Sequence, residues 1–205
     1  IFKYGTNMKF SIDFKKLGFA KEKKIYLEND GNLAAYSEYL SHFKNDYKNL
    51  IMLTFGTGVG GGIIYNSEIF KGSGNAGEIG RILINEKSYL EDVISAKAWT
   101  KKCQELYEIN KETKLSNIFY EEKVGSLLFD RSIDLEDYEK YARDEIIQNT
   151  SNALISLFEL FDNDIFVIGG SMTKSPYDFL PLIDEYISKN FEFPNRSFPK
   201  IKLSK

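Results

Sequence analysis

Apolar residues occur along this chain in short runs that alternate with longer segments in which they recur every three or four positions. The short runs are typical of buried strands, and the recurring pattern is typical of amphipathic helices. Strands separated by helices, with one hairpin of neighbouring strands, predict a mixed α/β fold. We expect strands over residues 24–28, 49–55, 62–65, 68–70, 82–85 and 164–168, a strand edge at the C-terminal "FPKIKLSK", and helices over residues 32–43, 90–108, 116–129, 134–161 and 176–189.

The segment "LTFGTGVGGGII", which begins at Leu53, places five glycines between two predicted strands. Gly56, Gly58 and Gly61 satisfy the dinucleotide-binding spacing G-x-G-x-x-G, but that motif requires a helix where "GGIIY" follows here. A protein-kinase glycine loop is excluded too, because D-F-G is absent and the single histidine, His42, lies upstream. Two interpretations stay open: a strand–turn–strand loop whose bare amides and threonine hydroxyl bind phosphate, or a plain flexible turn.

Charge and composition remove several functional classes. The net charge is −3 and no basic block is present, so a cationic surface for nucleic acid is not indicated within this segment. No apolar run approaches the roughly 20 residues of a membrane span, and no signal peptide is visible. The single cysteine, Cys103, cannot form an internal disulfide. We therefore expect a cytoplasmic protein that uses neither membrane nor nucleic acid through this segment.

Both ends of the sequence look like cuts through a longer polypeptide. Ile1 is not an initiator methionine, "IFKYGTNMKF" does not resemble the start of a domain, and the last residues end on a predicted strand edge. We expect the intact protein to be longer than these 205 residues.

An Asn-Asp pair follows the first predicted strand. The side-chain oxygen of Asn29 or Asp30 can accept the unpaired N–H groups in the first turn of the helix that comes next. A carboxylate at the end of a strand can also serve as a general base. The two roles are compatible, and the residues alone do not choose between them.

Three stretches, in this order, carry a family resemblance: "LENDGNLAAYSE" (27–38), "LTFGTGVGGGIIYNSEIFKGSGNAGEIGR" (53–81) and "FVIGGS" (166–171). From about Asn7 to its end, the chain resembles the ROK family of sugar kinases and sugar-responsive repressors. The resemblance implies the actin-like ATPase (ribonuclease H-like) fold of the α/β class, and an ATP- and Mg²⁺-dependent kinase. The expected acceptor is a hydroxyl, the 6-OH, of a hexose or N-acylhexosamine such as glucose or N-acetylmannosamine.

The resemblance also implies roles for individual residues. Asp30 would be the general base that accepts the proton of the attacking sugar hydroxyl, and Asn29 would hold another hydroxyl. Glu78, in "AGEIG", and Glu91, in "YLEDVISAKA", match the sugar-binding carboxylates of the family, and Asn7, in "TNMKF", matches a sugar-contacting asparagine. The nucleotide would be bound by two glycine-rich segments, its phosphates by Gly56, Thr57 and Gly58 and its adenosine end by Gly169, Gly170 and Ser171.

The chain departs from the family pattern at the zinc site. Where most members have a histidine after "GEIG", this chain has Arg81, and the cysteine motif that follows in relatives is missing. A closed tetrahedral site would need that histidine and three cysteines, so we predict that no structural zinc is bound. Arg81, grouped with the sugar-binding residues, either forms a fork-like ion pair with Glu78 or Glu91 or is an exposed loop residue.

The resemblance divides the chain and leaves alternatives open. Residues 1–45 would end the N-terminal lobe, and residues 46–205 would form the C-terminal lobe. The family's D-x-G-G-T phosphate loop would lie upstream of residue 1. We therefore expect this segment alone to have little kinase activity. A sugar-sensing domain of a ROK-type transcriptional repressor is the alternative function, and a degenerate binding module is the least favoured. The expected partners are a sugar and, through the aromatic-rich helices, a second copy of the chain in a homodimer.

Overall fold

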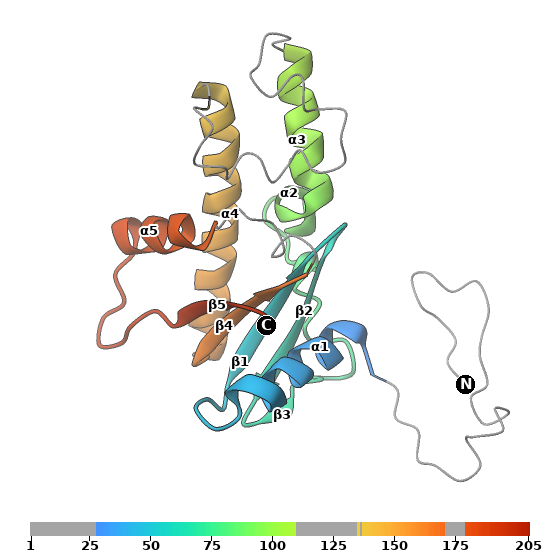
Figure 1. Ribbon diagram of the computed structural model, residues 1–205, viewed down its shortest axis with the longest axis vertical. Helices are drawn as coiled ribbons and strands as arrows, with labels where there is room; N and C mark the ends of the chain where they lie inside the picture. Colours follow the sequence, from blue (N-terminus) through green and yellow to red (C-terminus); the bar gives the residue numbers. More distant parts are fainter. Residues whose placement is uncertain (1–27, 110–134, 136, 171–178) are drawn as a thin grey trace, which may run out of the picture.

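A mixed sheet of five strands, in the order β3-β2-β1-β4-β5, lies at the centre of the molecule (Figure 1). The structure is a computed structural model of the 205-residue chain and describes residues 28–109, 135, 137–170 and 179–205. β1 pairs antiparallel with β2 and parallel with β4, and β4 pairs parallel with β5. The strands are β1 (Leu50–Phe55), β2 (Val59–Tyr65), β3 (Glu68–Ile69), β4 (Ile165–Gly169) and β5 (Lys200–Leu203).

The first three strands form a meander, as the sequence predicts. Asn66 and Ser67 connect β2 to β3 with positive φ angles of 50° and 70°, a combination typical of the tight turns that match the twist of antiparallel strands. β2 begins at Val59 and is longer than predicted, because Val59, Gly60 and Gly61 lie inside the strand and not in the turn before it. The strand predicted over residues 82–85 is wrong: Leu83 forms only an isolated bridge with Tyr89.

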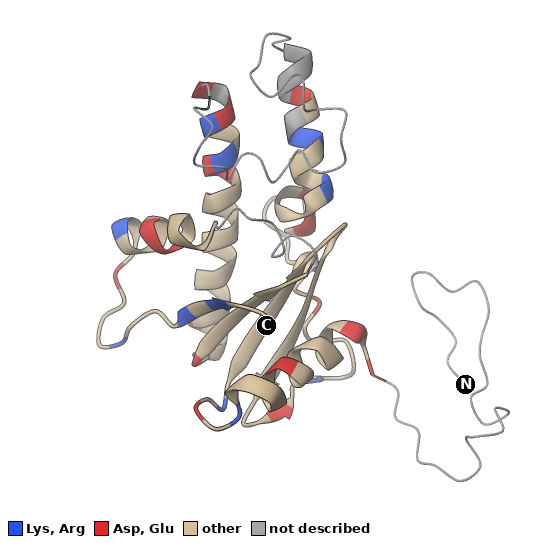
Figure 2. Ribbon diagram, in the orientation of Figure 1, with Lys and Arg blue, Asp and Glu red and all other residues tan. Residues whose placement is uncertain are grey.

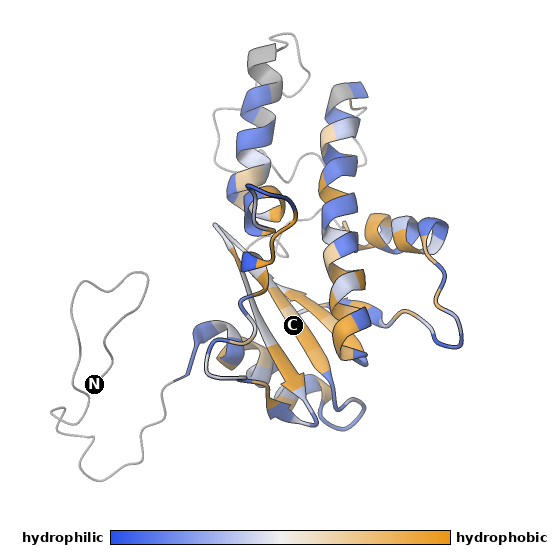
Figure 3. Ribbon diagram, turned by 180° about the vertical axis from the view of Figure 1, so that it is seen from behind, coloured by the Kyte–Doolittle hydropathy of each residue, from blue (hydrophilic) through white to orange (hydrophobic). Residues whose placement is uncertain are grey.

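Helices cover both faces of the sheet. Helix α1 (Asp30–Glu38) continues as a π-helix (Tyr39–Phe43) and lies on one face, whereas α2 (Glu91–Ile94), α3 (Ala96–Ile109), α4 (Asp137–Phe161) and α5 (Leu180–Asn190) lie on the other side (Figure 1). Seen from behind, the apolar residues are concentrated in the strands and in the part of α4 near the sheet (Figure 3). The result is a sheet between two helical layers.

Alternation along β1 and β4 explains the two cores. Successive side chains of a strand point to opposite faces, so neighbouring residues join different cores. In β1, Leu50 and Met52 pack with α1, whereas Ile51 and Leu53 pack with α4 and its neighbours. β4 repeats the pattern, and both strands are therefore apolar at almost every position. β1, β2 and β4 carry no charged residue, whereas α3 and α4 carry both signs (Figure 2).

The helix predicted over residues 90–108 is two helices. α2 ends at Ile94, and Ser95 is extended, with φ −75° and ψ 161°. The Ser95 hydroxyl accepts a hydrogen bond from the Ala98 N–H at 3.2 Å, so Ser95 acts as the N-cap of α3. The other described helices agree with the predictions within a few residues. The predicted helix over 116–129 and nearly all of the predicted strand over 24–28 lie outside the described residues.

The π-helical end of α1 and the helix itself pack on the sheet that follows them in sequence. Ala35, Tyr39 and Phe43 are buried against Leu50 and Ile64. The described part of residues 1–45 therefore shares a core with β1 and β2. The division of the chain into two lobes at residue 45 stays a prediction.

Candidate functional site

A pocket of about 520 Å³ lies where the first turn of α1, the loop between β1 and β2, and the segment around residues 77–91 meet. It brings together seven of the residues predicted from the sequence, from four separate parts of the chain. These are Asn29, Asp30, Gly56, Gly58, Glu78, Glu91 and Gly170. Asn7 and Ser171 lie outside the described residues, and Thr57, Arg81 and Gly169 do not line this pocket.

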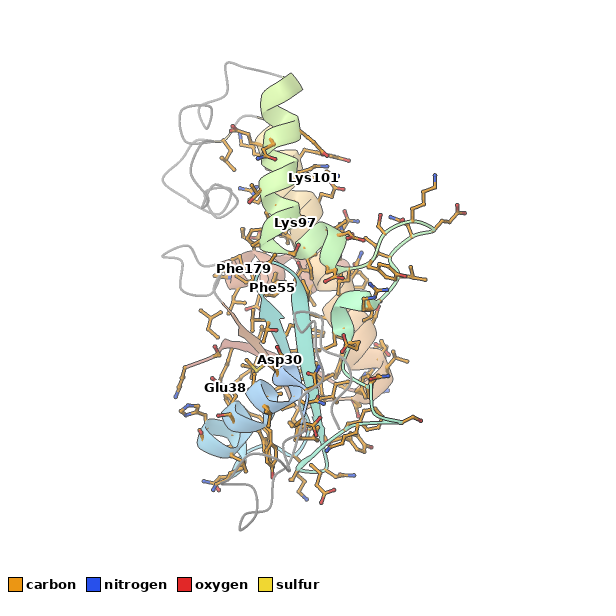
Figure 4. The ribbon with its side chains drawn as sticks, turned by 90° about the vertical axis from the view of Figure 1, so that its right-hand side faces the viewer. Asp30, Glu38, Phe55, Lys97, Lys101 and Phe179 are labelled. Carbon is orange, nitrogen blue, oxygen red and sulfur yellow. The ribbon has the colours of Figure 1, made fainter. Side chains whose placement is uncertain are left out.

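The start of α1 fixes the Asn-Asp pair. The Asn29 side chain accepts a hydrogen bond from the Asn32 N–H at 3.1 Å and is the N-cap of the helix, as one of the two sequence interpretations proposed. Asp30 is the first helical residue, and its Oδ1 accepts from the Gly31 N–H at 2.9 Å. Asp30 is exposed at the start of α1 (Figure 4), where the helix dipole favours negative charge, and it lines the pocket.

Glycines inside β2 let α1 approach the strand. A Cβ added to Gly31 would lie 2.3 Å from the Gly61 carbonyl oxygen, and one added to Gly62 would lie 2.6 Å from the Ala35 Cβ. The helix therefore rests on β2 backbone to backbone, which brings Asp30 beside the β1–β2 loop. The sequence interpretation missed this role, although three consecutive glycines inside an apolar strand are themselves a signal of close backbone approach.

The loop between β1 and β2 contains three residues, Gly56 to Gly58. The Gly56 N–H donates to the Gly58 carbonyl at 3.0 Å, and the Gly56 carbonyl accepts from the first N–H of α3, that of Ala96, at 2.9 Å. The loop is thus tied to the start of α3. One of the three amides predicted to bind phosphate already has a partner within the loop, and the Thr57 side chain is exposed outside the pocket lining.

Glu91 lies directly against this loop. A Cβ added to Gly58 would be 2.9 Å from the Glu91 Oε2, so the carboxylate packs directly against the loop backbone and would have to shift to admit a larger residue. Arg81 Nη1 is 4.0 Å from Glu91 Oε1, and the guanidinium stacks over the Tyr89 ring with its carbon 4.0 Å from the ring centroid. Arg81 therefore makes one long ionic contact and one stacking contact, not a fork, and its side chain is 59% exposed.

The end of β4 reaches the pocket through Gly170. Its φ is +101°, and an added Cβ would lie 2.1 Å from the Phe55 carbonyl oxygen, so both the backbone conformation and the close approach require glycine. Gly169 has a different environment: its Cβ position would contact Met52 and Ser204 instead. Of the predicted adenosine segment, Gly170 lines the pocket.

An ion pair that the sequence did not predict joins two sides of the pocket. Lys71, in the loop before Glu78, forms an ion pair with the Glu28 carboxylate. The same carboxylate accepts from the Asn29 N–H at 3.1 Å and from the buried Asn32 Nδ2 at 3.0 Å. These donors, Lys71 foremost, lower the pKa of Glu28 below its ordinary value. Glu28 directly precedes the Asn-Asp pair, but nothing in the sequence pattern pairs it with a lysine 43 positions later.

The described residues contain no group of three or more histidine, cysteine, aspartate or glutamate side chains arranged to hold a metal ion. The absence of structural zinc stays a prediction. None of the helices in the described part of the chain combines the length and apolarity needed to cross a bilayer.

The fold and the sequence define the class of protein. A profile of the ROK family matches residues 11–203, which is nearly the whole chain. This chain belongs to the ROK family.

Particular relatives include both kinases and a repressor. Glucokinase of Halalkalibacterium halodurans is 29% identical over 177 residues, covering 79% of this chain and 53% of the relative. N-acetylmannosamine kinase of Haemophilus influenzae is 26% identical over 176 residues, covering 85% and 56%. The xylose repressor of Staphylococcus xylosus is 37% identical over a shorter stretch of 87 residues, covering 38% and 23%.

A solved structure has the same fold. A ROK family glucokinase from Streptomyces griseus, in complex with glucose and AMPPNP, superposes with a TM-score of 0.70 at 22% identity, covering 87% of this chain and 62% of the glucokinase. The chain has the α/β fold of ROK proteins. It spans about half the length of the curated relatives that it matches.

Proposed function

We propose that this chain is part of an ATP-dependent sugar kinase that phosphorylates a hydroxyl of a hexose or N-acylhexosamine. The observation that carries the proposal is the lining of one pocket, in a ROK family chain, by Asp30, Glu78 and Glu91 and by Gly56 and Gly58 of the glycine loop. A base, groups for sugar hydroxyls and a phosphate loop are the parts that phosphoryl transfer to an alcohol requires.

Asp30 acts as the general base in this proposal. Its carboxylate takes the proton of the sugar hydroxyl while the hydroxyl oxygen forms a bond to the γ-phosphorus of ATP and the bond from that phosphorus to the β,γ-bridging oxygen breaks, releasing ADP. Asn29, Glu78 and Glu91 orient the sugar, because carboxylate and amide oxygens accept directed hydrogen bonds from hydroxyls. Asn7 belongs to the same proposed set.

ATP is bound at the loop 56–58 and at the end of β4. The Gly56 N–H donates within the loop, so the amides proposed for the phosphates are those of Thr57 and Gly58, with the Thr57 hydroxyl beside them. The place of Gly170 in the pocket lining supports a site for the adenosine end there, with Gly169 and Ser171 next to it in sequence. Mg²⁺, when bound with ATP, neutralises phosphate charge that three nearby carboxylates would otherwise repel.

The finer parts of the proposal rest on the family. They are the actin-like ATPase fold, a D-x-G-G-T phosphate loop outside these residues and two lobes divided near residue 45. We also propose that the protein is cytoplasmic and forms a homodimer. Glucose and N-acetylmannosamine are the acceptors to test first, since both kinds of kinase are among the relatives. Arg81 does not line the pocket, so it would influence the choice between them through its contact with Glu91.

Replacement of the proposed base tests this function. Asp30→Asn in the protein expressed from its intact gene should lower kcat at least about 100-fold in an ADP-release assay with glucose and N-acetylmannosamine, because proton abstraction is lost while the shape of the side chain is kept. The matched control is Asp46→Asn, an exposed carboxylate in the turn after the π-helix, which should retain wild-type turnover. Wild-type turnover by Asp30→Asn would overturn the role of Asp30.

A second function is supported by the 87-residue match to a xylose repressor. In that case the same pocket senses a sugar and does not turn it over. Roughly 70 or more extra residues upstream of residue 1 in the gene, carrying a helix-turn-helix pattern, would favour this function. Sugar-dependent release of operator DNA, without ADP formation, would decide for the repressor and against the kinase.

A further inference from the structure

We infer that the Glu28–Lys71 ion pair is a positioning device that sets the gap between the two sugar-contacting sides of the pocket. The inference rests on the proposed function, in which Asn29 and Asp30, from the first turn of α1, and Glu78, from the loop after Lys71, all contact the sugar. Neither Glu28 nor Lys71 lines the pocket, so both act through the residues they hold.

Glu28 is the fixed end of this device. One carboxylate oxygen, Oε1, accepts from the Asn29 N–H at 3.1 Å and from the Asn32 Nδ2 at 3.0 Å, and the other oxygen, Oε2, pairs with Lys71. Asn32 is only 2% exposed and is anchored in the first turn of α1. The carboxylate is therefore held by the same turn that carries the Asn-Asp pair.

Lys71 is the anchor of the loop that leads to Glu78. Its carbonyl oxygen accepts from the Gly74 N–H at 2.8 Å and from the Ala76 N–H at 3.1 Å, which closes the loop on Lys71 itself. Gly77 then passes close to α1: a Cβ there would lie 3.4 Å from the Asn32 Oδ1. Fixing Lys71 to Glu28 therefore fixes the loop on which Glu78 is carried.

The burial of Glu28 separates this pair from ordinary surface ion pairs. The Glu28 side chain is 14% exposed although Lys71 is 54% exposed, whereas both partners of Lys189–Glu185 on α5 are more than half exposed. Exposed ion pairs contribute little to stability, because solvent screens the charges and the long side chains lose conformational entropy when they pair. A carboxylate with three donors and little solvent instead holds its partner in one place, and a small displacement of groups that orient a substrate is costly.

The test compares KM for the sugar with KM for ATP in the protein from its intact gene, using glucose and N-acetylmannosamine. Lys71→Met and Glu28→Gln should each raise KM for the sugar roughly 10-fold. KM for ATP should change less than about twofold, because the ATP loop 56–58 is tied to α3 and not to Lys71. The double variant should be no worse than either single one, since both remove the same link.

Two controls separate positioning from folding. Lys71→Arg keeps the cation and should stay within about threefold of the wild-type KM for the sugar, and Lys189→Met, which breaks the exposed pair on α5, should leave both KM values unchanged. Equal changes in both KM values, or multiplying effects in the double variant, would overturn the inference.

Amide hydrogen exchange tests the role of the ion pair independently of the proposed function. Lys71→Met should speed exchange at residues 72–78 while β1 and β4 stay protected, whether or not the protein phosphorylates a sugar. If the wild type turned over neither sugar, the proposed function would fail while this readout still decided on the ion pair. Unchanged amide exchange at residues 72–78 in Lys71→Met would overturn the inference about the ion pair.

Discussion

At the scale of single residues, Glu28 is an acid whose charge is closely tied to the folded state. Lys71, the Asn29 N–H and the Asn32 amide all donate to its carboxylate, and the pKa of Glu28 is lowered from its ordinary value of 4.5 as a result. The unfolded chain therefore takes up this proton at a higher pH than the folded chain does. Stability from Glu28 is present above about pH 4.5 and is lost as the pH falls through the lower, folded-state pKa.

Glu28→Gln should reveal this dependence directly. The difference in free energy of unfolding between wild type and Glu28→Gln, measured by urea denaturation, should be largest near neutral pH and shrink as the pH falls below about 4.5. The reason is that protonated Glu28 resembles glutamine in carrying no charge. A difference that stayed constant from neutral to acid pH would contradict the ion pair in solution.

Gly31 has a strict steric requirement at the start of α1. Alanine there would improve helix propensity, but its Cβ would lie 2.3 Å from a backbone oxygen of β2 that cannot move without disturbing the sheet. Gly31→Ala should lower the free energy of unfolding by about 2 kcal/mol, as expected for overpacking. Thermal and urea unfolding would measure the loss.

Ser37→Ala is the matched control for Gly31→Ala. Ser37 lies on the exposed side of the same helix, so its replacement should change stability by less than about 0.5 kcal/mol. Equal stabilities of the two variants would mean that α1 does not rest on β2 as described.

At this scale the sequence predicted many of the residues that line the pocket and few of the contacts that hold those residues in place. Asn29, Asp30, Glu78 and Glu91 could be named because the short ordered motifs around them resemble those of the ROK family. The contacts that hold them, such as Lys71 with Glu28, join segments distant in sequence through freely rotating side chains. No local pattern of residue types carries that information.

At the scale of elements, the break between α2 and α3 shows how one side chain can override a helical pattern. The apolar spacing over residues 90–108 fits a single helix, yet the Ser95 hydroxyl caps a new one and its backbone is extended. Serine competes well for backbone N–H groups, and a sequence pattern does not say when it wins. The break matters for the site, because the first N–H of α3 bonds to the glycine loop.

Ser95→Ala tests the cap. Ser95 is buried and its hydroxyl satisfies the Ala98 N–H, so its loss should cost about 1 kcal/mol in the free energy of unfolding. Ser156→Ala is the matched control, because the exposed Ser156 hydroxyl only donates back to the Asn152 carbonyl within α4. A cost for Ser95→Ala no larger than that of the control, in urea unfolding, would contradict the cap.

At the scale of the whole molecule, the sheet order β3-β2-β1-β4-β5 brings segments of the site that are distant in sequence next to one another. β1 is central, and its C-terminal end carries the glycine loop next to the end of the parallel strand β4, where Gly170 lies. The α/β class and the adjacent antiparallel strands could be predicted from alternation and turns. Pairing of β1 with β4, more than a hundred residues apart, could be reached only through the family resemblance, because pairing across such distances leaves no local signal.

The three consecutive glycines of β2, residues 60–62, limit how this protein can be stabilised by mutation. Engineers commonly exchange glycines in strands for β-branched residues, which restrict the unfolded chain and pack well on a pleated surface. At position 62 this exchange fails, since the new Cβ would lie 2.6 Å from the Gly31 carbonyl oxygen; at positions 60 and 61 it would displace the side chains of Thr54 and Ile79, each 2.6 Å away. Thermostable versions have to be sought away from this strand, for example on the outward faces of α3 and α4.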